Sequence, residues 1–301
     1  MERESLLALL TMSFGGLLLQ LCAAWPSTDD RRRTPQALER RYWFRLWYPV
    51  IPTFVVVLWL IGWALREPDP VPGPVDPGVV VALSVPFVTM FLRAGLRALW
   101  ALMRRPPQTA VSTVGLIQPQ VIFAPFLAKQ LDDDVVRAAL LHEQAHVRHR
   151  DPLRIWLAQL VTDLQWPWPQ APRRLERWLE ALELARDDEA RVQGADGSGL
   201  ANAILASLRY RNEAESAGPL PAAWGNVRWS VQAPLTGEAR VLRERIARLL
   251  APLPSNVGHS PRSAPRWYRV AWLVIPLVAC VIACGAEYGE QVLRPLLGLT
   301  S

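Results

Sequence analysis

Long apolar segments are the feature that most constrains how this chain can fold. Apolar residues make up 51% of its 301 residues, and they gather in runs. A bilayer core about 30 Å thick requires about 20 predominantly apolar residues from each spanning helix. Runs of about that length predict four transmembrane helices, at about residues 5–25, 49–65, 78–95 and 267–286. The alternative is that one or two of them, the third above all, are buried helices of a soluble fold.

The charges between these runs predict how the chain lies in a membrane. The loop 26–47 carries six arginines against three acidic residues, whereas the loop 66–77 is net acidic. The positive-inside rule therefore places the first loop in the cytoplasm and the second outside. Residues 104–266 are then cytoplasmic, and residues 287–301 form a short extracytoplasmic tail. The first run could instead be a signal peptide, but its weakly basic start and poor cleavage site favour a retained helix.

One short motif carries specific chemistry. The run from His142 to His146 reads His-Glu-Gln-Ala-His, an H-E-x-x-H pattern. Two imidazoles four residues apart lie on one helical face and can reach the same zinc ion. Glu143 would then be the catalytic base toward a water activated by the metal. By chance alone the motif arises in roughly one such chain in a hundred, and it could mark a solvated helix face. The mostly apolar residues around it favour a buried helix, whose polar groups need partners such as a metal.

A third ligand has to come from elsewhere in the chain. His149 is about 10 Å along the helix axis from His142 and is expected to be a polar residue at the helix end. His259 lies in a loop-like stretch, so a carboxylate is the expected ligand. A predicted helix over 173–192 has an acidic stripe made of Glu176, Glu180, Glu183 and Asp187. Periodicity does not say which of these carboxylates binds a metal, and the stripe could simply be solvated.

Three segments, taken in order, resemble a known family. They are the segment 114–125 with its V-G-x-x-x-P pattern, the segment 141–151 with H-E-x-x-H and an R-x-D tail, and the segment 183–190 with an E-x-A-x-D-E-A-like pattern. A later stretch, 242–250, is similar to that family's R-I-x-R-L-L helix. Together they resemble the BlaR/MecR-type membrane zinc metallopeptidases, which are gluzincins of the beta-lactam sensor-transducer group.

The resemblance implies a complete site. His142 and His146 would bind Zn²⁺ with Glu183 as the third ligand, Glu143 would be the base, and Asp187 would orient a histidine ligand. The chain departs from the family pattern at Arg186, where the family often has a cysteine, and at Asp188, an extra acid that leaves the local alignment uncertain by one. The short tail also lacks room for the family's extracellular penicillin-binding sensor.

The expected fold is a polytopic α-helical membrane protein with an inserted zinc peptidase domain. Residues 1–103 would hold three transmembrane helices, 104–266 a helix-dominated α+β gluzincin-like domain, and 267–286 the fourth transmembrane helix. Within the domain, residues 111–116 and 120–123 predict a hairpin beside the metal helix. Further helices are expected over 197–212 and 238–250.

The expected function is that of a membrane zinc metalloendopeptidase in signal transduction. It would cut a protein or peptide, either a cytoplasmic repressor or itself, from the cytoplasmic side of a bacterial inner membrane. The alternatives are a transducer with a structural zinc site and a scaffold in which the motif is accidental. The net charge of +6 is attributed to arginines beside the membrane, so lipid contact and no direct nucleic-acid binding are expected.

Overall fold

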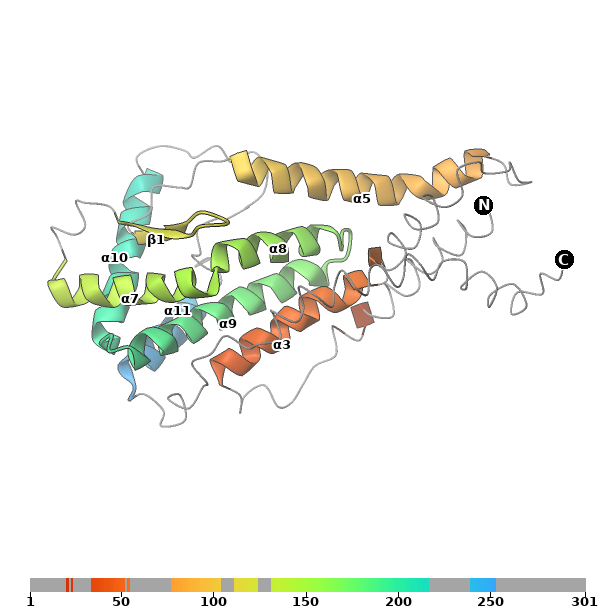
Figure 1. The fold of residues 1–301 in the computed structure, drawn as a ribbon. Helices are drawn as coiled ribbons and strands as arrows, with labels where there is room; N and C mark the ends of the chain where they lie inside the picture. The colour runs from red at the N-terminus through yellow and green to blue at the C-terminus, as the bar shows by residue number, and fades with distance from the viewer. Residues whose placement is uncertain are drawn as a thin grey trace. The chain divides into compact units, whose positions relative to one another are not determined.

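The computed structural model describes residues 20–21, 23, 34–51, 53–54, 77–103, 111–123, 131–216 and 239–252. These parts are mostly helical (Figure 1). Their α-helices are α3 (Pro35–Trp47), α5 (Pro77–Met103), α7 (Asp133–His149), α8 (Asp151–Asp163), α9 (Gln170–Val192), α10 (Gly197–Ser216) and α11 (Ala239–Leu250). A 3₁₀ turn, η3 (Tyr48–Val50), follows α3, and two strands, β1 (Val111–Val114) and β2 (Gln120–Phe123), precede α7.

The chain divides into two compact units. The first consists of Met1–Pro26, Trp47–Met90 and Ser260–Ser301, and the second of Ser27–Leu46 and Phe91–His259. Most of the first unit lies outside the described residues. The second unit contains most of α3, the last part of α5, the two strands and the helices α7 to α11. It is therefore built from segments on both sides of the predicted transmembrane run 49–65.

The helix α7 lies at the centre of the second unit. Asp133 and Asp134 occupy its first turn, where their charges favour the positive end of the helix dipole. The helix packs against α9 and α10 through small apolar residues. At Gly199 in α10, an added Cβ would come within 3.2 Å of the Cβ of Ala138 in α7, so the glycine permits a close approach of the two helices.

The predicted hairpin is present and packs beside α7. β1 and β2 pair antiparallel, with Val111 opposite Phe123 and Val114 opposite Gln120. Gly115 begins the turn with a φ of +99°, and a Cβ at that position would meet the carbonyl oxygen of Gln118. A glycine is therefore required where β1 ends. Both strands contact α7, the helix that carries the H-E-x-x-H motif.

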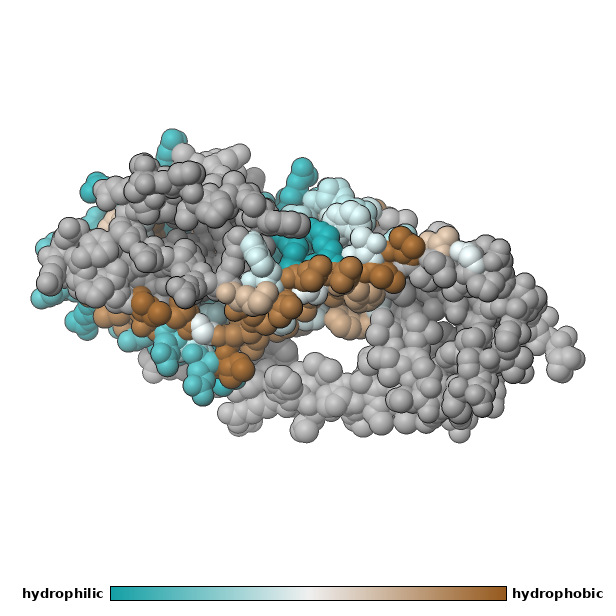
Figure 2. Space-filling view, turned by 90° about the horizontal axis from the view of Figure 1, so that it is seen from above, coloured by the Kyte–Doolittle hydropathy of each residue, from teal (hydrophilic) through white to brown (hydrophobic). Residues whose placement is uncertain are grey.

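The segment predicted as the third transmembrane helix forms a longer helix than expected. The sequence predicts a span over 78–95, whereas α5 continues to Met103 and includes Pro86. Its stretch Val85–Met103 is long and apolar enough to cross a membrane, which is weak evidence on its own. Figure 2 shows a brown apolar band over this helix, to which exposed side chains contribute: Val85, Val88, Leu92, Leu96, Leu99 and Met103.

Two arginines of α5 contact the helix α8 of this unit. Arg93 and Arg97 lie within α5 and ion-pair with the buried Asp163 of α8, at 3.4 Å and 3.1 Å. The predicted loop 26–47 differs from the structure, because residues from Pro35 onward form α3. The runs 5–25 and 267–286 and most of 49–65 lie outside the described residues, apart from a few positions.

Candidate metal centre

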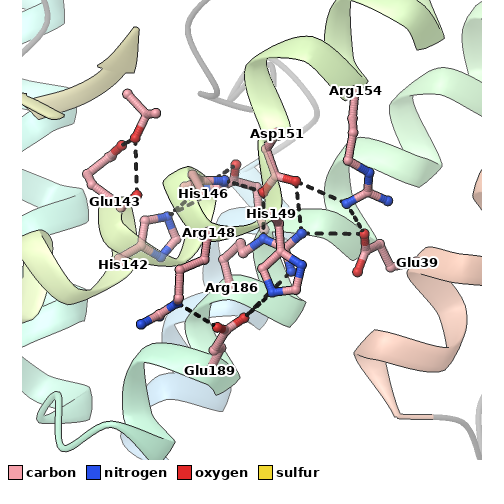
Figure 3. A network of polar contacts seen from close by, with 12 residues as sticks. Glu39, His142, Glu143, His146, Arg148, His149, Asp151, Arg154, Arg186 and Glu189 are labelled. Atoms are coloured by element: carbon pink, nitrogen blue, oxygen red, sulfur yellow. Dashed lines mark hydrogen bonds and ion pairs between the residues drawn. The ribbon is translucent and has the colours of Figure 1, made fainter. Parts of the chain in front are cut away.

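The two motif histidines project from α7 toward α9. His142 and His146 are one turn apart, and their Nε2 atoms lie 3.0 Å from each other (Figure 3). The carboxylate of Glu183, in the middle of α9, lies 3.5 Å from Nε2 of His142 and 3.7 Å from Nε2 of His146. The ligand atoms of these three residues all lie within 4.8 Å of one another, so the group could hold a metal ion. Periodicity left open which carboxylate of the acidic stripe lies beside the two histidines. In the structure that carboxylate is the one of Glu183.

Two carboxylates of the acidic stripe on α9, those of Glu183 and Asp187, are buried. Glu183 is 5% exposed and Asp187 is 2% exposed, while Glu176 at the start of the same stripe is exposed. The stripe on α9 therefore turns from solvent into the protein interior along its length. Buried carboxylates require charged or hydrogen-bonding partners, because water cannot solvate them there.

Each histidine has a carboxylate at its other ring nitrogen. Nδ1 of His146 makes a 2.8 Å hydrogen bond with Asp151 Oδ2, and Nδ1 of His142 lies 2.9 Å from Asp187 Oδ1. The second contact is nearly as short as the first, although it does not meet the criteria for a hydrogen bond. A carboxylate only accepts hydrogen bonds, so a neutral imidazole at either position would carry its hydrogen on Nδ1 and turn the lone pair of Nε2 toward the other ring. Two facing lone pairs repel each other unless a proton or a metal cation lies between them.

The donor set fits a zinc ion. Zinc bonds to nitrogen and oxygen of about 2.0 to 2.2 Å give a tetrahedron with edges of roughly 3.3 to 3.6 Å. The two Nε2 atoms lie 3.0 Å apart, Glu183 Oε2 lies 3.5 Å from Nε2 of His142, and Glu183 Oε1 lies 3.7 Å from Nε2 of His146, so these nearest contacts are close to that range. Two imidazoles and one carboxylate are ligand types that zinc accepts, and a buried carboxylate lies behind each imidazole.

Arg245 of α11 balances the negative charge around the histidines. Its Nη2 lies 3.0 Å from Glu183 Oε2, and its Nε donates a 2.6 Å hydrogen bond to Asp187 Oδ2. Asp188, the extra acid that made the alignment uncertain, points instead at Arg248 at 2.8 Å. Asp187 is therefore the carboxylate that faces His142, and its role in orienting that ring stays a prediction.

The charges in this centre shift its pKa values. Burial by itself would lower the pKa of His142, but the adjacent carboxylates of Asp187 and Glu183 raise it from 6.5 to about 10. Burial would raise the pKa of Glu183 and of Asp187, but the charge of Arg245 outweighs it and holds both below their usual values. In the metal-free protein His142 is thus an imidazolium between two carboxylates.

Glu143 faces the hairpin, on the other side of the motif. The hydroxyl of Thr113, a buried residue of β1, lies 2.7 Å from Glu143 Oε2 and 3.1 Å from the Glu143 carbonyl oxygen. A hydroxyl has one hydrogen to donate, and the carboxylate, at the shorter distance, is the stronger acceptor. β1 therefore holds the side chain of the proposed base. Thr113 carried no signal in the sequence beyond its place in a short strand.

A helix break brings Asp151 to His146. α7 ends at His149, Arg150 adopts a left-handed conformation with φ +51° and ψ +43°, and α8 begins at Asp151. This elbow brings a residue five positions after His146 back to its ring. Arg186 of α9 then donates from Nε and Nη2 to the two oxygens of Asp151, at 2.5 Å and 2.9 Å. Burial would raise the pKa of Asp151, but the charge of Arg186 outweighs it and holds that pKa well below its usual value.

His149, which was expected to be a polar residue at the helix end, lies outside the group of possible metal ligands. It is at the end of α7, is exposed, and pairs with Glu189 at 2.8 Å. His259 lies outside the described residues. Sequence reasoning named neither Arg245 nor Asp151 as part of the centre, although both lie in segments that carried the resemblance.

Comparison of the chain with models of protein families, with curated proteins and with solved structures finds no match.

Proposed function

We propose that the chain is a membrane-anchored zinc metallopeptidase. The proposal depends on one observation: His142 Nε2, His146 Nε2 and the Glu183 carboxylate converge in one centre. Glu143 follows His142 directly in the chain and is not part of this ligand group. A structural zinc site is closed by four protein ligands, whereas a catalytic site has three and keeps one position open. Among the described residues the group has three members, which favours the catalytic kind.

The residues of the chain have distinct tasks in this mechanism. His142, His146 and Glu183 would hold the zinc ion, which when bound polarises the scissile carbonyl and makes water more acidic. Glu143 accepts the proton of the attacking water and passes it to the leaving amine. Thr113 keeps the Glu143 carboxylate oriented through its hydroxyl. Asp187 and Asp151 fix the tautomers of the two imidazoles.

The hairpin is the proposed place for the substrate backbone. β1 and β2 are the two strands among the described residues, and they pack on the helix of the motif. A peptide added in extended form to a strand edge gains main-chain hydrogen bonds without depending on its sequence. The hairpin would thus present the scissile bond to Glu143, which β1 already contacts through Thr113.

The cellular role is proposed from the sequence patterns. The apolar runs and the flanking arginines favour a multi-pass protein of the bacterial inner membrane with the peptidase unit in the cytoplasm. The resemblance to BlaR/MecR-type peptidases favours a signalling role in which a cytoplasmic regulator or the chain itself is cut. The membrane-length stretch of α5 agrees with this placement and is weak support by itself.

Zinc content and cleavage, measured on the same samples, test the proposal. The full chain is purified in detergent, its zinc is quantified, and a casein or self-cleavage assay is run with and without a chelator. We expect one zinc per chain and chelator-sensitive cleavage. Glu143→Gln should keep the zinc and lose cleavage, whereas His142→Ala should lose both.

Three results would contradict the proposal in different ways. If Glu143→Gln keeps both zinc and the wild-type rate of cleavage, Glu143 is not the base. If the wild type binds zinc but cuts nothing, and His142→Ala unfolds, the site is a structural one in a membrane transducer. If purified wild type takes up no zinc, the H-E-x-x-H motif is accidental.

A further inference from the structure

The ion pairs behind His146 continue from Asp151 into α3. Asp151 is fully buried and receives hydrogen bonds from both Arg186 and Arg154, the latter at 3.0 Å. Both arginines also reach Glu39 of α3, Arg154 Nη1 at 2.6 Å and Arg186 Nη2 at 3.5 Å. Figure 3 shows these side chains as one continuous network from the His146 ring to Glu39. Glu39 is only 6% exposed.

Glu39 completes the charge balance of this network. Asp151 alone faces two guanidinium groups, which would leave one excess positive charge beside a proposed zinc ligand. The carboxylate of Glu39 offsets that charge, and a buried charge without an opposite partner is costly. Glu189 also approaches Arg186 at 3.8 Å, but it is more exposed and pairs already with Arg148 and His149.

Packing fixes α3 against the helices that carry the two arginines. Trp43 of α3 lies against Trp178 of α9, with ring centroids 5.1 Å apart. The guanidinium of Arg154 lies over both rings, 5.1 Å from the Trp43 centroid and 5.6 Å from the Trp178 centroid. Gln165 donates a 2.9 Å hydrogen bond to the carbonyl of Leu46, at the end of the part of α3 that belongs to this unit.

We propose that α3 is a functional part of the metal centre and that Glu39 is a positioning residue, which acts through Arg154, Arg186 and Asp151 to set how strongly His146 binds the metal. This inference rests on the proposed zinc site and adds to it a segment that precedes the predicted run 49–65. A peptidase unit that started after the third predicted transmembrane helix would lack this residue. The zinc affinity of such a unit would then be lower than that of the full chain.

Zinc affinity of the full chain in detergent tests the proposal. Glu39→Gln keeps the volume of the side chain and removes its charge. We expect it to weaken zinc binding about tenfold, the lower end of the range for groups behind a metal ligand. Glu39→Asp, which keeps the charge, should restore part of the affinity. Glu176→Gln, the same change at an exposed position of α9, should bind zinc like the wild type. Affinity is measured by competition with a chelator, and the fold is checked by circular dichroism.

A double-mutant cycle separates positioning from general stability. If Glu39 acts through Asp151, the change Glu39→Gln should have little further effect on zinc affinity once Asp151→Asn is present. Additive losses in the double variant would overturn the proposal, and so would wild-type affinity in a folded Glu39→Gln protein. If Glu39→Gln does not fold, Arg154→Gln, at a partly exposed position, must weaken zinc binding instead. If Arg154→Gln binds zinc like the wild type, the role proposed for Glu39 is wrong but the proposed zinc site is not affected. If the wild type itself binds no zinc, both the role of Glu39 and the proposed function are wrong.

Discussion

Zinc binding should displace a proton from His142, and this coupling can be measured. The pKa of His142 in the metal-free protein is about 10, although burial alone would lower it, because Asp187 and Glu183 face the ring. A histidine must lose its Nε2 proton before that nitrogen can bind a metal. Below pH 10, zinc therefore competes with one proton at this site. The apparent affinity for zinc should rise about tenfold for each pH unit.

The same proton changes the stability of the metal-free protein in the opposite direction. The folded pKa of His142 lies above its ordinary value of 6.5, so its contribution to stability is fully present below pH 6.5. That contribution is lost as the pH rises through about 10. The difference between these two pKa values corresponds to about 5 kcal/mol. Metal-free protein should thus become less stable as the pH rises, whereas the stabilisation from zinc should grow.

Calorimetry in two buffers with different heats of protonation gives the number of protons released. We expect about one proton per zinc between roughly pH 6 and pH 7.5, together with the tenfold change in affinity per pH unit. Asp187→Asn is the informative variant, because it removes the carboxylate nearest to His142 Nδ1. It should lower the His142 pKa and reduce the proton release near neutral pH. Zinc affinity in the wild type that does not change with pH over this range would refute the reasoning.

Further substitutions test single contacts. Glu183→Gln should abolish stable zinc binding, while Glu180→Gln on the same helix should retain it; equal zinc contents would remove Glu183 from the ligand set. Thr113→Val, which removes the hydroxyl that contacts Glu143, should leave zinc content unchanged and lower kcat about tenfold, as for other groups that orient a reacting side chain. An unchanged kcat would show that β1 does not position the base. Trp178→Ala, at a fully buried position, should cost about 3 to 5 kcal/mol of stability in chemical unfolding, and a loss below about 1 kcal/mol would contradict its place in the core.

Local patterns predicted the described elements around the motif well. The helix that carries His142 and His146, the hairpin before it and the helix that carries Glu183 are all confirmed as elements, with small shifts at their ends. These elements have clear periodicity or turn residues, and such signals depend only on neighbours in the sequence. His142, His146 and Glu183 converge in a group that could hold a metal ion, while metal binding itself, the identity of the metal and the reaction stay predictions.

The supporting residues could not be predicted in the same way. Arg245 reaches Glu183 from α11, and Glu39 reaches Arg186 from α3, so both contacts join parts of the chain that are far apart in sequence. No periodic pattern links such positions, because tertiary packing alone brings them together. Asp151 is close to His146 in the sequence, but a spacing of five residues does not lie on one helical face, and only the left-handed Arg150 makes the contact possible.

Because α7 and α8 meet at the left-handed Arg150, the direction of the Asp151 carboxylate depends on the number of residues between His146 and α8. Each residue added to or removed from a helix turns the remainder of that helix by about 100° around its axis. One inserted residue between His146 and α8 would point the Asp151 carboxylate away from the ring and take Arg154 out of reach of its partners. Loop lengths elsewhere could vary among relatives of this chain, but this junction should tolerate substitution far better than a change in length.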